Sequence, residues 1–123
     1  MILVNATKNT GVSERCSFAN SVLKRMVGLL NCKTLMAGDG LLIDQCCGIH
    51  TVGMRFPIDV VFLDRDLRVL RAIGALCPWR ICAVLKAVYV LELPAGSVER
   101  SRIQAGDQIH IRNSQSGPTP AQA

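Results

Sequence analysis

The residues best suited to chemistry lie in one short run, CCGIHTVGM, which spans Cys46 to Met54. It holds two adjacent cysteines and His50, one of only two histidines in the chain. Thiolate and imidazole are common zinc ligands, and Cys77 with Cys82 could complete a set of four. However, zinc ligands usually come in pairs about two to four residues apart, and adjacent side chains of an extended segment point to opposite faces. The spacing therefore favours buried free thiols, and no metal or other cofactor is predicted.

Cysteine–histidine catalysis is the second chemistry that this run suggests. A thiolate needs a base or a positive field beside it, and His50 is near Cys46 and Cys47 in the sequence. Closeness along an extended chain is not contact, however. The GxSxG nucleophile elbow of hydrolases is also absent from the sequence. Nucleophilic catalysis is therefore the less favoured interpretation of the run.

Two carboxylates interrupt apolar segments that are expected to be buried strands. Asp59 follows Ile58 and precedes an apolar run, and Glu92 lies between Leu91 and Leu93. A buried charge is costly unless it is paired or accepts several hydrogen bonds. Partners of suitable type lie nearby in the sequence: His50, Thr51 and Arg55. Two interpretations remain. The polar groups could be hydrogen-bonded to one another and fix the strand register, or they could form a cluster at the mouth of a pocket. Composition favours the first interpretation.

Short strands are the elements that must position these residues. Apolar runs and alternating patterns predict strands over residues 1–4, 13–18, 41–44, 48–52, 58–63, 68–73, 87–93 and 108–112. An amphipathic helix is predicted after a cap at Asn20 or Ser21, and a short helical turn over 97–103. This order predicts a mostly β (α+β) fold. It would be an antiparallel sandwich or partial barrel of short strands with one amphipathic helix packed on it.

Some segments carry finer predictions. Residues 58–63 form the most apolar segment and are expected to be buried on both faces of a sheet, with a hairpin turn following at Asp64. Near the end of the domain, Ile109 and Ile111 are expected to face inward. A single β-rich domain is expected over 1–112. The tail 113–123 has nothing to bury and is expected to be disordered.

Composition restricts the partners and the compartment. The net charge is +5, but the basic residues are scattered and aromatic residues are few, so nucleic acid is not expected as a partner. No apolar run approaches the roughly 20 residues needed to cross a bilayer, and the start does not resemble a signal peptide. Six cysteines without such a leader favour free thiols in a reducing compartment. A cytoplasmic location is therefore predicted.

Several runs occur in an order that matches a known family. They are Gly28-Leu29-Leu30, Gly40-Leu41-Leu42, Ile49-His50-Thr51-x-Gly53-Met54-Arg55-x-Pro57-Ile58-Asp59-x-x-Phe62-Leu63-Asp64, Val90-Leu91-Glu92-Leu93-x-Ala95-Gly96 and Gly106-Asp107. Over roughly residues 15 to 112 the chain resembles the bacterial and archaeal family called domain of unknown function 192, in its His-Thr-x-Gly-Met subgroup. The resemblance implies a small, mostly β, sandwich-like domain without an established activity. Leu67 stands where the family usually has glycine, which predicts a longer or distorted turn at Asp64 to Arg68.

The polar part of this motif supplies the candidate site. The candidate binding residues are His50, Thr51, Met54, Arg55, Asp59, Asp64 and Glu92. If their strands are neighbours, the polar groups are expected to gather on one side of the sheet.

These residues lead to three hypotheses about function. The first is a small binding or accessory module with a polar cleft around His50 and Asp59 that takes a small ligand or a peptide. The second is a small hydrolase or metal-dependent enzyme in which His50 is the acid or base, oriented by Asp59 or Glu92. The third is an interaction module that binds a partner through the Cys77 to Lys86 loop with Trp79.

Overall fold

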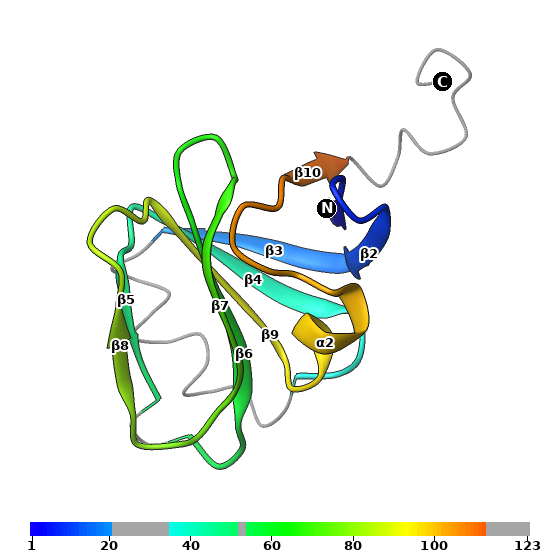
Figure 1. Ribbon diagram of the computed structural model, residues 1–123. Helices are drawn as coiled ribbons and strands as arrows, with labels where there is room; N and C mark the ends of the chain where they lie inside the picture. The colour runs from blue at the N-terminus through cyan, green and yellow to red at the C-terminus, as the bar shows by residue number, and fades with distance from the viewer. Residues whose placement is uncertain (21–34, 52–53, 113–123) are drawn as a thin grey trace.

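Ten strands and one short helix form the part of the chain that the structure describes (Figure 1). The computed structural model describes residues 1–20, 35–51 and 54–112. The strands are β1 (Ile2–Asn5), β2 (Thr10–Ser13), β3 (Arg15–Asn20), β4 (Asp39–Asp44), β5 (Gly48–His50), β6 (Ile58–Leu63), β7 (Val69–Leu76), β8 (Ile81–Ala83), β9 (Tyr89–Pro94) and β10 (Ile109–Arg112). The helix is α2 (Ser97–Ser101). No helix among these residues is long and apolar enough to cross a membrane.

The strands form three sheets. The largest has the order β3-β4-β9-β6-β7, a second has the order β10-β1-β2, and β5 pairs with β8 alone. The prediction of a mostly β sandwich is confirmed, and the sheets do not close into a barrel. One pairing differs from the antiparallel expectation, because β3 and β4 run parallel. Parallel neighbours need a long connection, and residues 21–38 separate β3 from β4 in the sequence.

The five-stranded sheet is the middle layer of the molecule and has a hydrophobic core on each face. One core joins the sheet to β1, β2, β10 and α2 and includes Leu3, Leu91, Leu93 and Ile109. The other joins the sheet to the β5–β8 pair and includes Ile49, Met54, Phe62 and Val90. Figure 1 shows β5 and β8 on one side of this sheet and β1, β2 and β10 on the other.

Strand β6 lies between β9 and β7 in this middle layer, and all six of its residues are buried, as predicted. Alternate residues belong to opposite cores because successive side chains of a strand point to opposite faces. Val61 and Leu63 lie in the core toward α2, whereas Ile58, Val60 and Phe62 lie in the core toward β5.

The hairpin between β6 and β7 is also confirmed, and its turn has a distinctive residue. Leu67 adopts a φ of 63°, a left-handed conformation that glycine adopts without steric cost. The Asp64 carboxylate stabilises the turn by accepting hydrogen bonds from the backbone N–H groups of Asp66 at 2.8 Å and Arg68 at 3.0 Å. Leu67 therefore has the backbone conformation expected of the glycine that it replaces, and the longer or distorted turn stays a prediction.

Two predictions about strands were wrong, and one strand was missed. The segment 13–18 is divided between β2 and β3, which belong to different sheets. Strand β8 was not predicted at all. Ile111 is 44% exposed rather than inward-facing, because β10 is at the edge of its sheet. The predicted helix after Ser21 and the predicted disordered tail lie outside the described residues.

Candidate functional site

The structure does not bring the predicted polar residues together. Asp59 pairs with Leu93 across β6 and β9, whereas Glu92 pairs with Val60. Paired residues share a face of a sheet, so Asp59 lies on the face toward α2 and Glu92 on the face toward β5. Both side chains are buried. The expectation that these two carboxylates gather on one side of the sheet is therefore wrong. Glu92 lies opposite the residue after Asp59, and successive residues of a strand point to opposite faces.

The Asp59 carboxylate links two backbone segments. Its Oδ1 accepts a hydrogen bond from the N–H of Ala75 at 2.7 Å, and its Oδ2 accepts one from the N–H of Val98 at 2.7 Å. Val98 is in the first turn of α2, whose own cap residue, Gly96, offers no side-chain acceptor. A helix begins with N–H groups that have no partner within the helix, so Asp59 supplies the missing acceptor from β6.

Thr51 holds the start of β8 in place. Its Oγ1 donates a hydrogen bond to the carbonyl of Cys77 at 2.7 Å and accepts one from the N–H of Arg80 at 2.8 Å. Its backbone N–H donates to the carbonyl of Arg80 at 2.8 Å, and its carbonyl accepts from the N–H of Trp79 at 2.9 Å. Thr51 is fully buried, and it fixes the backbone of the loop that precedes β8.

The remaining predicted residues fall into separate environments. Met54 is buried in the core between the large sheet and β5. Asp64 stabilises the β6–β7 turn, and His50 and Arg55 are exposed. His50 lies opposite Ile81 in the β5–β8 pair.

The five cysteines that the structure describes do not form a cluster with histidine or carboxylate. Among the described residues, no three His, Cys, Asp or Glu side chains lie together in an arrangement that could hold a metal ion. Cys16, Cys46, Cys47, Cys77 and Cys82 are free thiols. Burial raises the pKa of the Cys16 thiol to about 11, against smaller lowering effects of the N-terminal ammonium and a backbone hydrogen bond from Leu42. Cys16 is therefore a neutral, core-filling residue at physiological pH.

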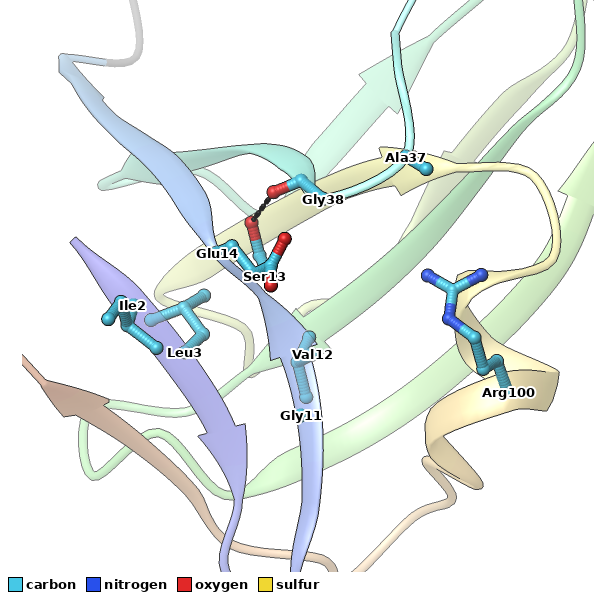
Figure 2. A pocket seen from close by; sticks show the side chains of 9 residues that line it. All are labelled: Ile2, Leu3, Gly11, Val12, Ser13, Glu14, Ala37, Gly38 and Arg100. Carbon is cyan, nitrogen blue, oxygen red and sulfur yellow. Dashed lines mark hydrogen bonds between the residues drawn. The ribbon is translucent and has the colours of Figure 1, made fainter. Parts of the chain in front are cut away.

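A pocket lies elsewhere, between the strands β1 and β2, the segment before β4 and the helix α2 (Figure 2). Its volume is about 410 Å³. We call it the Ser13 pocket, and its lining residues are Ile2, Leu3, Gly11, Val12, Ser13, Glu14, Ala37, Gly38 and Arg100. None of them was predicted as a site residue, because they come from four separate segments that only the fold brings together. The one local signal was Gly38-Asp39-Gly40, which the sequence indicates only as a turn.

Polar groups of both charges line the Ser13 pocket. The Ser13 hydroxyl donates a hydrogen bond to the carbonyl of Gly38 at 2.8 Å, which joins β2 to the segment before β4. The Glu14 carboxylate is 80% exposed and lies 3.7 Å from the Arg15 guanidinium. Figure 2 shows Arg100 reaching toward the pocket from α2, on the side away from Ser13 and Glu14.

Arg100 is available for an anionic group. Among the described residues it forms no ion pair, and its Nη2 makes one long hydrogen bond of 3.5 Å to the Ser97 hydroxyl. The pocket therefore offers a carboxylate from one wall and a guanidinium from another.

The fold and the motif residues define a class of small β-sandwich domain with two cores on one central sheet. The family model DUF192 (Uncharacterized ACR, COG1430) matches residues 3–111, and the chain belongs to this family.

Curated relatives and a solved structure agree with this assignment. The chain is 34% identical over 112 residues to the UPF0127 protein PH1112 of Pyrococcus horikoshii, covering 88% of this chain and 96% of that protein. It is 30% identical over 111 residues to the UPF0127 protein PF1050 of Pyrococcus furiosus, covering 87% and 95%. A crystal structure of a protein of unknown function from Novosphingobium aromaticivorans has the same fold, with a TM-score of 0.77, 20% identity and coverage of 89% and 83%.

Proposed function

We propose that this chain is a binding module for a small ligand, and that the ligand occupies the Ser13 pocket rather than a cleft around His50 and Asp59. The observation that carries the proposal is a pocket of about 410 Å³ with an apolar floor and with charged groups on two walls. Pockets for small molecules commonly measure about 300–1,000 Å³ and combine apolar walls with a few polar groups that orient the ligand.

The lining indicates the chemical class of the ligand. Leu3 and Val12 offer apolar surface, Arg100 offers a guanidinium for a carboxylate or phosphate, and Glu14 offers an acceptor for an ammonium or hydroxyl group. A compact molecule with an anionic group, a hydrogen-bond donor and a small apolar body fits this pattern. A zwitterion of the size of an amino acid or dipeptide is the simplest example.

The alternative of a hydrolase or metal-dependent enzyme has less support. His50 is exposed on β5, and the Asp59 carboxylate lies on the opposite face of the central sheet with its oxygens bonded to backbone N–H groups. Glu92 shares the face toward β5 but is buried. We place the binding function in the cytoplasm, and the free thiols of the five described cysteines support a reducing compartment.

The test is a thermal-shift screen of the purified protein against amino acids, dipeptides and small carboxylates, followed by calorimetry on the compounds that bind. Arg100→Met removes the cation but keeps the length of the side chain, and we expect it to weaken binding about 10- to 100-fold. Arg65→Met is the matched control, since Arg65 is exposed at the β6–β7 turn and does not line the pocket.

A second variant blocks the pocket without disturbing the core. A Cβ added at Gly11 would meet nothing within 4 Å, so Gly11→Leu places its side chain in open space at the pocket wall. We expect this variant to keep the melting temperature of the wild type and to lose binding. Unchanged affinity in both Arg100→Met and Gly11→Leu would show that the ligand binds elsewhere.

A further inference from the structure

The β5–β8 pair carries a second feature, on the other side of the central sheet from the Ser13 pocket. In this pair Ile49 lies opposite Cys82, and both pack toward the core, whereas His50 lies opposite Ile81 and both are exposed. Two more large apolar side chains close to Ile81 in the sequence are also exposed, one before β8 and one after it. Trp79 is 65% exposed, Ile81 80% and Leu85 92%. We call these three residues the β8 patch.

Six large apolar side chains are exposed in the part of the chain that the structure describes, and three of them belong to the β8 patch, including the two most exposed. Alternate residues of the same segment, Cys82 and Val84, pack against the core as expected for one face of a strand. The other face would usually be polar, but here it presents an aromatic and two aliphatic side chains to solvent. Contiguous exposed apolar groups of this kind mark surfaces that meet a partner or a membrane.

The charges around the β8 patch are of one sign. Residues 77–88 contain Arg80 and Lys86, both exposed, and no acidic residue. The facing segment, 45–56, contains the exposed Arg55 and likewise no acidic residue. The whole chain has nine acidic residues, and none of them falls in these two segments, so the charged side chains next to the β8 patch in the sequence are all cationic.

The patch is held in a fixed conformation. Trp79 adopts a φ of 64°, a left-handed conformation that is unfavourable for a bulky residue. Hydrogen bonds from Trp79 and Arg80 to Thr51 keep the loop in this conformation, and the Thr51 hydroxyl also binds the carbonyl of Cys77. The exposure of Trp79 is therefore a property of the folded state and does not come from a loose loop.

We propose that the β8 patch docks on the surface of an anionic lipid bilayer. Trp79, Ile81 and Leu85 enter the interfacial layer, and the side chains of Arg80 and Lys86 bind headgroup phosphates. Tryptophan favours the membrane interface, and apolar residues beside lysine and arginine are the composition of interfacial anchors.

A lipid surface fits these observations better than a protein partner does. A stable protein interface buries about 800 Å² on each partner and has few charged residues at its centre. The β8 patch has three apolar side chains interleaved with cations: Ile81 lies in β8, and Trp79 and Leu85 lie in the segments just before and after it. Such a surface matches a layer of anionic headgroups over an apolar interior. The Ser13 pocket is on the other side of the central sheet, so the docking proposal does not depend on the proposed function.

The test uses Trp79 as its own reporter, because it is the only tryptophan in the chain. The full chain is titrated with vesicles of phosphatidylcholine alone and of phosphatidylcholine with phosphatidylglycerol. Tryptophan emission and co-sedimentation are measured at low and high salt. We expect a blue shift and co-sedimentation with the anionic vesicles that weaken at high salt, and little binding to the neutral vesicles.

Variants at exposed positions separate the apolar contribution to membrane binding from the electrostatic one. Ile81→Ser with Leu85→Ser should weaken partitioning about a hundredfold, and Arg80→Gln with Lys86→Gln about thirtyfold. Arg102→Gln with Arg112→Gln removes the same charge from exposed positions at the end of α2 and in β10, on the other side of the central sheet, and should have a much smaller effect. Melting temperatures check that each variant is folded.

Three results would overturn the proposal. The first is no binding of the wild type to anionic vesicles. The second is equal binding by the patch variants, and the third is equal binding to neutral vesicles. If the patch variants change only the self-association of the protein in solution, the patch is a protein interface. None of these outcomes bears on ligand binding in the Ser13 pocket, which calorimetry measures separately.

Discussion

The carboxylate of Asp59 connects parts of the chain that are far apart in sequence. It accepts hydrogen bonds from Ala75, which has a left-handed φ of 53°, and from Val98 at the start of α2. A buried aspartate was predictable from the sequence as a costly group that needs partners. Its partners were not predictable, because they are backbone N–H groups and any residue type can supply them. The three side chains proposed from the sequence, His50, Thr51 and Arg55, are not among its hydrogen-bond partners.

The first prediction concerns this carboxylate. Asp59→Asn replaces one acceptor oxygen with an N–H₂ donor that faces a backbone donor, so we expect the free energy of unfolding to fall by about 1–3 kcal/mol. His50→Ala should change it by less than about 0.5 kcal/mol, since His50 is exposed. Urea unfolding of both variants provides the measurement. Equal stability of Asp59→Asn and wild type would contradict the structural role.

The sequence does not reveal which face of the sheet each buried carboxylate occupies. Asp59 and Glu92 each interrupt an apolar strand, and the pattern of each strand is consistent with either face. Only the register between β6 and β9, which pairs Val60 with Glu92, separates the two carboxylates. A shift of one residue would have placed them on one face, and the sequence contains no local signal that fixes this register.

At the scale of elements, the long apolar strands were predictable and the three-residue strand β8 was not. Strand β6 was recognisable because its residues, which are apolar except for Asp59, suit a strand that is covered on both faces. Strand β8 has three residues and an exposed Ile81, so its apolar pattern does not indicate which side is buried. Its position depends on Thr51, which is remote in sequence from Cys77 and Arg80.

The second prediction concerns this attachment. Thr51→Val keeps the shape of the side chain but removes the hydroxyl, which leaves the carbonyl of Cys77 and the N–H of Arg80 without their partner. We expect a loss of about 1–3 kcal/mol in the free energy of unfolding and faster hydrogen exchange of the Trp79 and Arg80 amides. Thr51→Ser is the control, since it keeps the hydroxyl. Slow exchange in Thr51→Val would show that the hydroxyl is not needed to hold β8.

For the whole molecule, Asp107 joins the first and last parts of the described chain. Its Oδ2 accepts hydrogen bonds from Asn5 at 2.9 Å, from the Lys8 ammonium at 2.9 Å and from the N–H of Gln104 at 3.1 Å. Burial acts to raise the pKa of Asp107, but the hydrogen bonds from Lys8, Asn5 and Gln104 outweigh it and hold the pKa below the ordinary value of 3.8. The charged form is therefore favoured in the folded state.

The third prediction follows from that shift. A carboxylate with a lowered pKa in the folded state stabilises the protein fully above its unfolded pKa, and this stabilisation is lost as the pH falls through the folded pKa. Asp107→Asn should lower the free energy of unfolding by about 1–3 kcal/mol at neutral pH, and the difference from wild type should shrink below about pH 4. Asp66→Asn, at an exposed position, is the control. A difference that stays constant into acid would refute the assignment.

The central position of β6 has a consequence for how the domain unfolds. Because its alternate side chains belong to both cores, neither core can come apart while the other stays intact. We therefore expect the two cores to unfold in one cooperative event, and the amides of Val60, Val61 and Phe62 to exchange with deuterium only in that event. A ligand that stabilises the folded state on either side of the sheet would slow that exchange, each by an amount set by its own affinity and concentration, so these three amides report occupancy at both surfaces.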